Sequence, residues 1–419
     1  MTGADSLAGA DPRAGTDPRA GTGPLAGSDP LAGAVPLAGA GPLAGAGPLA
    51  GSDPRAGAVS LAGAGPLAGA AVLVAEHGTG LQVTRVYEDQ DGGFLWWHGP
   101  GHRHAGPLRA PLGLVPLVPG REAGAGAALL STGQTHGTGL LHRAAGSVSA
   151  AAWLRDPRPQ AGRLVAHSLT AAARALRALH GVPLPQGLEP APPPGLRRLR
   201  EWASGTVPLV PAAERLRRHA LEVWGSARTA RLLDWADDAE RPTGVGASAV
   251  LLHGWASTGA LVPPRSRGRV ALLTGQDLGA GRRELDLGWM LGDLVELAWS
   301  SPLYRVAHDR AGAREEEGTG LPSAAVLQQV FLGVYGDGVH GGVGEGGDGV
   351  YGEGVDRTGG GGPGYDPAAV GRCAVLRVVT HMRDFATYCE WSDELLDYLA
   401  FTAELIDEEG RRAVPRGVS

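Results

Sequence analysis

The sequence contains no lysine, because all 37 of its basic residues are arginine. No side-chain ammonium group is therefore present to hold a phosphate, and sites that depend on a lysine are excluded. Cysteine is almost absent as well. Cys373 and Cys389 stand sixteen residues apart, without a histidine or second cysteine at metal-ligand spacing. This usage is typical of a reduced protein, so we expect a cytoplasmic location.

Long hydrophobic runs and an excess of positive charge are also missing. No stretch of eighteen apolar residues occurs, and no basic segment precedes an apolar one at the start. We therefore expect neither a membrane span nor a signal peptide. The formal net charge of -6 gives no polycationic surface, which argues against nucleic acid or anionic membrane as partners.

The first part of the chain is a repeat of low complexity. Residues 5–70 form eleven hexapeptides built mainly from Ala, Gly, Pro and Leu. A β-solenoid with stacked leucines is one interpretation. However, Arg13, Arg19 and Arg55 occupy interior positions of such a coil, and the recurring prolines cannot donate ladder hydrogen bonds. We predict that residues 1–70 are a disordered tail.

The rest of the chain divides into a β-rich part and a helical part. Short runs rich in Val, Tyr and Trp, broken by Gly pairs, predict a β-rich N-terminal lobe over residues 71–126. Residues 127–137 are interpreted as a crossover strand and hinge, and residues 138–419 as a helical C-terminal lobe. Half of residues 333–364 are glycine, which indicates a flexible insertion.

Four segments of the helical part have helical spacing. Residues 168–181 begin at a Ser that could cap a helix and end at Gly181, and residues 284–300 are apolar enough for a buried helix. The segments 366–391 and 392–410 are expected to be two closing helices.

Residues 251–294 resemble the catalytic segment of a known family. His253-Gly254, a strand ending at Thr274, and Asp286-Leu287 twelve residues later keep the spacing of aminoglycoside phosphotransferases and choline kinase-like proteins. The family pattern reads H-G-D-x-x-x-x-N, then I-D, then D-L. The resemblance implies an α+β, two-lobed protein kinase-like fold. It also places Trp255 at the catalytic aspartate position.

Two metal-binding positions of the same pattern are changed. Ala260 stands where the family has a metal-binding Asn, and Thr274 stands where it has a metal-binding Asp. Phosphoryl transfer needs Mg²⁺ on the phosphates and a carboxylate beside the acceptor hydroxyl. Asp277 is the first carboxylate after Glu240 and could serve only if the metal site had moved by three residues.

A second stretch, residues 92–115, resembles the strand and helix that hold the nucleotide phosphates in these families. Gly99-Pro100 and the run from Gly106 to Ala110 match, which places Trp97 at the family's Lys position and Pro111 at its Glu position. Gly78 and Gly80 lie where a nucleotide-covering loop is expected, although a plain hairpin turn is the more frequent meaning of such a pair.

Two further roles are implied by the resemblance. In the relatives, the Asp that matches Asp286 braces the catalytic loop by hydrogen bonds, which is a structural role. Relatives that modify aminoglycosides bind their cationic substrates through late helices, so Asp393, Glu394 and Asp397 are candidates for a cation site. A charged terminal helix is otherwise usually a solvated face.

These observations favour a non-catalytic phosphotransferase-like protein, a pseudokinase that binds a partner protein or a small cationic ligand. No cofactor and no metal are expected in that case. One alternative is an active phosphotransferase on a small hydroxylated substrate, with ATP and Mg²⁺ as cofactors and Asp277 as a displaced site residue. Another is a decaying copy without function.

Overall fold

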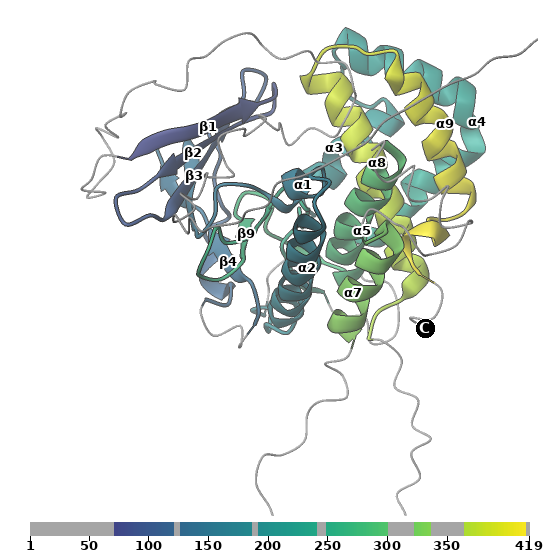
Figure 1. The fold of residues 1–419 in the computed structure, drawn as a ribbon. Coiled ribbons are helices and arrows are strands. Elements are labelled where there is room, and N and C mark those ends of the chain that lie inside the picture. Colours follow the sequence, from purple (N-terminus) through teal and green to yellow (C-terminus); the bar gives the residue numbers. More distant parts are fainter. Residues whose placement is uncertain are drawn as a thin grey trace, which may run out of the picture. The chain divides into compact units, whose positions relative to one another are not determined.

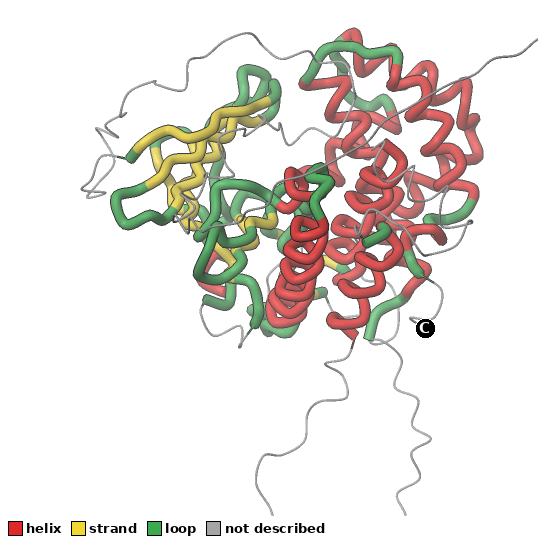
Figure 2. The backbone as a smooth tube through the Cα atoms, in the orientation of Figure 1, coloured by secondary structure: helices red, strands yellow, loops and turns green. Residues whose placement is uncertain are grey.

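A computed structural model describes residues 71–120, 126–186, 192–240, 249–300, 322–336 and 364–415. The predicted tail, residues 1–70, and most of the glycine-rich segment lie outside these residues. β-Strands make up the N-terminal part and helices most of the remainder (Figure 1), as the strands and helices in Figure 2 also show. The prediction of a β-rich N-terminal part followed by a helical part is confirmed.

The N-terminal sheet is antiparallel and has the strand order β1-β2-β3-β6-β5. Its strands are β1 (Val72–Gly78), β2 (Gln82–Glu88), β3 (Phe94–Pro100), β5 (Gln134–His136) and β6 (Gly139–Ala144). Side chains alternate between the two faces along β3. Trp96 packs with Leu273 on one face, whereas Leu95 and Trp97 pack with Tyr87 and Leu141 on the other.

A second, smaller sheet connects the two parts of the chain. β4 (Leu129–Thr132) runs parallel to β9 (Ala271–Thr274), which also pairs with β8 (Leu261–Val262). The range 127–137, predicted as the hinge, therefore contains β4 and β5, and the N-terminal sheet continues through β6 to Ala144. The predicted boundary fell too early because β4 and β6 each pair with a distant strand, β9 and β3, and only β5 pairs locally, with β6.

Helices make up most of the described chain after β6. They are α1 (Ala150–Trp153), α2 (Pro159–His180), α3 (Pro194–Ser204), α4 (Pro211–Glu240), α5 (Arg283–Ser300), α7 (Ala324–Gly336), α8 (Pro367–Tyr388) and α9 (Glu394–Asp407). Asp366 caps α8 by accepting the Ala368 amide at 2.9 Å. Gly205 ends α3 with a positive φ of 67°.

One helix start and one loop boundary differ from the sequence predictions. α2 begins at Pro159 rather than at Ser168, and the Ser168 hydroxyl donates within the helix to the Leu164 carbonyl at 2.8 Å. α7 continues to Gly336, so the first residues of the predicted insertion are helical. Buried residues at helical spacing before Ser168 lengthen α2 at its start, whereas α7 extends into the glycine-rich segment at its end.

The centre of the helical part is the contact between α5 and α8. Almost all of α5 is buried. A side chain at Gly288 or Gly292 would lie within 2.4 to 2.7 Å of Cys373 or Ala374 on α8, so glycine at these positions allows the two helices to approach closely. β7 (Val250–Leu252) and β10 (Gly279–Gly281) form an antiparallel pair before α5. No helix among the described residues is long and apolar enough to cross a membrane.

Candidate functional site

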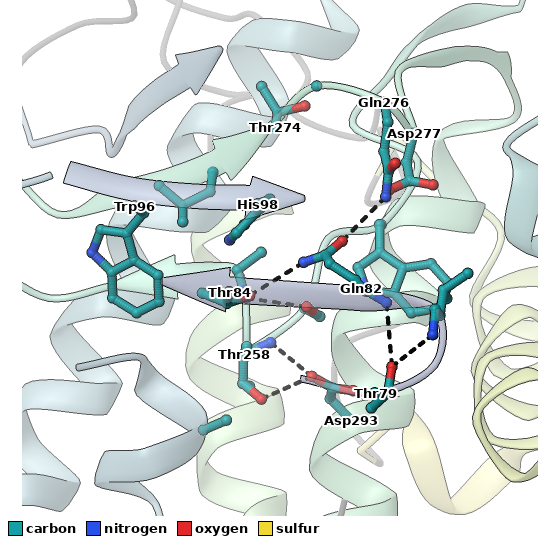
Figure 3. Close-up of a pocket in the computed structure, with 18 of the residues that line it drawn as sticks. Thr79, Gln82, Thr84, Trp96, His98, Thr258, Thr274, Gln276, Asp277 and Asp293 are labelled. Atoms are coloured by element: carbon teal, nitrogen blue, oxygen red, sulfur yellow. Dashed lines mark hydrogen bonds between the residues drawn. The ribbon is translucent and has the colours of Figure 1, made fainter. Parts of the chain in front are cut away.

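A pocket lies where the N-terminal sheet, the loop after β7 and the helical part meet. Its wall is formed by the β1–β2 turn, by β3 and β6, by residues 253–260, by the end of β9, and by α5 and α8. Figure 3 shows Thr258 directed toward Asp293 and Gln276 directed toward Gln82 within this wall. The motif positions singled out in the sequence, and Asp277 beside them, all line this pocket: His253, Trp255, Ala260, Thr274 and Asp277.

The loop after β7 is held by the carboxylate of Asp286, which is fully buried at the start of α5. One oxygen accepts the backbone amide of His253 at 2.7 Å, and the other accepts the amide of Gly254 at 2.8 Å. Nε2 of His180 lies 3.1 Å from the first oxygen. Gly254 has a φ of 80°, and a side chain there would meet the Asp277 carbonyl oxygen, so glycine is required at this turn.

His253 is oriented by a second set of hydrogen bonds. Its Nε2 donates to the Leu273 carbonyl at 2.9 Å, and its Nδ1 accepts the Trp255 amide at 3.3 Å. Burial lowers the pKa of His253, and the nearby Asp286 carboxylate opposes that shift. The imidazole therefore acts as a neutral brace between the loop and β9.

Trp255 fills the place that the resemblance assigns to a catalytic carboxylate. Its ring meets the Trp289 ring edge to face at 6.0 Å. The guanidinium groups of Arg198 and Arg377 lie 5.8 and 5.7 Å from its ring centre, within the range of cation–π attraction. A side chain at Gly195 on α3 would lie 2.8 Å from the indole. The indole is thus packed between α3, α5 and α8.

The two positions that the resemblance assigns to metal ligands present no strong ligand. Ala260 has no ligand atom, and its backbone amide donates to the hydroxyl of Ser257 at 3.2 Å. Thr274 ends β9, and its buried hydroxyl oxygen has no hydrogen-bond partner. Magnesium prefers carboxylate oxygens in near-octahedral geometry, so the residues at these positions do not fit that ion. No group of three metal-ligating side chains occurs in the part of the chain that the structure describes.

Asp277 lies in the same pocket, three residues beyond Thr274. Burial raises the pKa of Asp277 to about 6; Arg198 opposes the shift and Asp384 adds to it. Arg198 itself pairs with Asp384 at 2.8 Å. The carboxyl of Asp277 therefore loses its proton less readily than an exposed aspartate. The neighbouring Arg198 already forms an ion pair with Asp384.

Sequence reasoning missed a buried ion cluster that lines the pocket on α5 and α8. Asp293 accepts the amide and hydroxyl of Thr258 at 2.7 and 2.8 Å and also pairs with Arg377. Glu296 pairs with Arg377 at 3.3 Å and with His381. Burial opposes ionisation of Glu296, but His381 and Arg377 outweigh it and hold its pKa at about 2. The only sequence signal was an acidic pair inside an apolar helix.

The pocket wall on β3 is made by Trp96 and His98 and not by Trp97. Trp97 lies on the opposite face of the sheet, where its Nε1 donates to the His136 carbonyl at 3.3 Å and Arg85 lies 5.2 Å from its ring. The expectation that Trp97 occupies a cleft-facing position is wrong. Because strand side chains alternate, a shift of one residue moves the whole pattern to the other face.

Two histidines, His98 on β3 and His142 on β6, line this wall. The rings of His98 and His142 lie 4.8 Å apart, and burial, with mutual repulsion, lowers the pKa of His98 well below its ordinary value. His142 Nδ1 lies 2.9 Å from the Ser131 carbonyl, so it is the protonated nitrogen. Burial lowers the pKa of His142 to about 4. Both imidazoles are therefore neutral near pH 7.

The β1–β2 turn covers the pocket and is attached to the far end of α8. Gly78 and Thr79 line the pocket. The amide of Gly80 donates to the Tyr388 carbonyl at 2.8 Å. Arg103, which follows β3, donates its amide to the Gly80 carbonyl at 2.8 Å and its guanidinium to the Thr387 carbonyl at 2.7 Å. Pro111, by contrast, starts a turn before the 3-10 helix η1 (Val115–Leu117) and is not part of the wall.

The three acidic residues proposed for a cation site are not on the pocket. Asp393, Glu394 and Asp397 lie at the start of α9, and Asp393 is 84% exposed, 3.8 Å from Arg215. Asp397 is exposed too. The acidic side chains that the fold brings to the pocket are Asp277, Asp293 and Glu296.

Comparisons with known proteins give matches among solved structures only. No family model and no curated protein matches the chain. An amicoumacin kinase in complex with AMP-PNP, Ca²⁺ and amicoumacin is 12% identical, with a TM-score of 0.46, and the match covers 83% of this chain and 90% of that one. A choline kinase from Cryptosporidium parvum is 11% identical over 82% and 90% of the two chains, with a TM-score of 0.42.

A putative aminoglycoside phosphotransferase from Ralstonia eutropha is 14% identical, with a TM-score of 0.41, and covers 84% of this chain and 95% of its own.

Proposed function

We propose that this chain is a non-catalytic aminoglycoside phosphotransferase-like protein, a pseudokinase whose pocket binds a ligand or a partner without phosphoryl transfer. One observation carries the proposal. The three positions that the sequence resemblance assigns to the catalytic base and to two metal ligands are Trp255, Ala260 and Thr274, and all three face one pocket.

The side chains at these positions supply none of the required chemistry. An indole cannot accept the proton of an attacking hydroxyl, a methyl group cannot bind a cation, and a neutral hydroxyl is a weak ligand. The buried hydroxyl of Thr274 lacks even a hydrogen-bond partner. Phosphoryl transfer depends on positioning and charge neutralisation, so the loss of these groups removes its main contributions.

The loop nevertheless keeps its shape. The carboxylate of Asp286 still binds the amides of His253 and Gly254, and the packing of Trp255 against Trp289 fills the space beside them. A preserved pocket with altered chemistry supports binding as the retained function.

Thermal unfolding of the full-length chain with Mg²⁺ alone and with MgATP tests the proposal. A ligand that binds the native state must raise the melting temperature, and we expect no shift at millimolar MgATP. A shift of several degrees, together with transfer of the γ-phosphate to a small alcohol, would overturn the proposal.

An active phosphotransferase is a second candidate, favoured by Asp277. This carboxyl lies on the same pocket, and a pKa of about 6 suits a general base near neutral pH. Its substrate would be a small hydroxylated compound, with ATP and Mg²⁺ as cofactors. If this candidate is right, an ATP-dependent activity will be present in the wild type and lost in Asp277→Asn, while the exposed Asp397→Asn control keeps it.

A further inference from the structure

One charged side chain of the pocket has no partner. The guanidinium of Arg155, which follows α1, lines the pocket. Among the described residues it makes no hydrogen bond and no ion pair, and its Nε atom is buried without a partner. Burial lowers the pKa of Arg155, and the attraction of Glu296 offsets that shift only in part. Arg155 is half-buried, and a buried polar atom such as its Nε costs free energy when it has no hydrogen-bond partner.

The other charges of the pocket wall are already compensated. Asp293 and Glu296 pair with Arg377, and Glu296 also pairs with His381. Arg198 pairs with Asp384 and attracts Asp277. Asp293 and Glu296 are therefore engaged by Arg377, whereas Arg155 is attracted by Glu296 without forming an ion pair with it.

We propose that Arg155 forms an anion-binding subsite that takes the carboxylate of a small ligand with an apolar body. The inference rests on the proposed function, since it names the ligand class of the same pocket. The planar guanidinium fork matches a carboxylate in two parallel hydrogen bonds. Ala151, Ala260 and Leu297 line the same pocket and offer apolar contact to the remainder of the ligand.

The charge balance favours a carboxylate over a phosphate. A carboxylate carries one negative charge, which matches one unpaired arginine. A phosphate dianion would bring a second charge close to Glu296 and Asp293, which are ionised and buried on the same wall. The expected ligand is thus opposite in charge to the small cation that the sequence resemblance implied.

Two small probes with the same ring and opposite charge test the proposal: benzoate and benzamidinium. Isothermal titration and thermal unfolding of the full-length chain are measured with each probe and with inorganic phosphate. We expect benzoate to bind and to raise the melting temperature, with weaker or no effect of benzamidinium and phosphate. Benzoate binding no stronger than benzamidinium binding, or phosphate binding without benzoate binding, would overturn the proposal.

Arg155→Gln locates the subsite, and Arg163→Gln is the matched control, because Arg163 is exposed on α2. We expect Arg155→Gln to weaken benzoate binding about tenfold or more and Arg163→Gln to leave it unchanged. Without ligand, Arg155→Gln should melt at the wild-type temperature or higher, because an unpaired desolvated charge is removed. Equal benzoate affinity in both variants, or a large loss of stability in Arg155→Gln alone, contradicts the subsite.

The failure of this inference is distinguishable from the failure of the proposed function. A MgATP-dependent shift and phosphotransfer would refute the pseudokinase and leave the benzoate result standing. Loss of the preference for benzoate would refute the anion subsite and leave the MgATP result standing.

Discussion

The carboxylate of Asp286 lies 2.7 Å from the backbone nitrogen of His253 and bridges α5 to a loop that lies 33 residues earlier in the chain. Its other oxygen accepts a hydrogen bond from the next backbone amide, that of Gly254. These two bonds involve backbone donors that a fully buried loop has no water to satisfy. The carboxylate therefore has a role in holding the loop that does not require catalysis.

Asp286→Ala should lower the free energy of unfolding by about 2 to 4 kcal/mol, because two buried amides and His180 lose their partner. Urea denaturation measures the change. Asp397→Ala is the control, since Asp397 is exposed on α9, and it should change stability by less than about 0.5 kcal/mol. A similar loss of unfolding free energy in the two variants would contradict the role of Asp286 in holding the loop.

Asp277 should make stability depend on pH in a defined direction. Burial raises the pKa of Asp277 from 3.8 to about 6, so the folded state resists ionisation. Its contribution to stability is fully present below about pH 4, and it is lost as the pH rises through about 6. We expect the stability of the wild type relative to Asp277→Asn to fall by roughly 1 to 2 kcal/mol between these pH values.

The comparison of two variants isolates this effect from other titrating groups. His98 and His142 have lowered pKa values, so their titration makes stability rise with pH, opposite to the effect of Asp277. Both histidines are present in the wild type and in Asp277→Asn, so their effect cancels in the difference. Denaturation curves collected from pH 4 to 7.5, at intervals of about half a unit, give the difference directly. A relative stability that rises with pH would show that Asp277 is ionised more easily in the fold than in the unfolded chain.

Arg103 should hold the β1–β2 turn over the pocket. Its side chain donates to the Thr387 carbonyl at 2.7 Å, and a charged donor of this kind contributes about 1.5 to 3 kcal/mol when buried and less when partly exposed. Arg103→Ala is expected to speed limited proteolysis within residues 78–81 and to lower the melting temperature. Arg109→Ala, whose guanidinium bonds only to the adjacent Leu108 carbonyl, should leave both measurements unchanged.

Removal of residues 1–70 should not change the melting temperature of the remaining chain. Ala, Gly and Pro dominate that segment, and they bury too little apolar area to offset the entropy of ordering. Circular dichroism and thermal unfolding of the truncated and full-length proteins provide the test. A lower melting temperature after truncation, or a loss of β signal, would indicate an ordered tail.

Local patterns in the sequence predicted the buried helix α5 and the closing helices α8 and α9. Each combines apolar spacing with a signal at its start or end, and such signals act within a few residues. The loop around His253 was also predictable, because the spacing from His253 to Asp286 is a property of the sequence alone.

The residues that line the pocket were harder to predict from the sequence. The face on which Trp97 lies depends on a one-residue register, and the alternation of the strand allowed either choice. The pairing of Arg377 with Asp293 joins residues 84 positions apart. No local sequence pattern predicts a contact between such distant residues. Arg155 could not be singled out either, because its lack of a partner is a property of the packed structure.

The attachment of the β1–β2 turn to the end of α8 has a consequence for the order of folding. The bond from Arg103 to Thr387 spans 284 residues of sequence, and the bond from Gly80 to Tyr388 spans a similar length. Contacts between such distant segments carry a large loop-closure cost and form after the local ones. We therefore expect the turn to close over the pocket only after both the first strands and the last helices have formed.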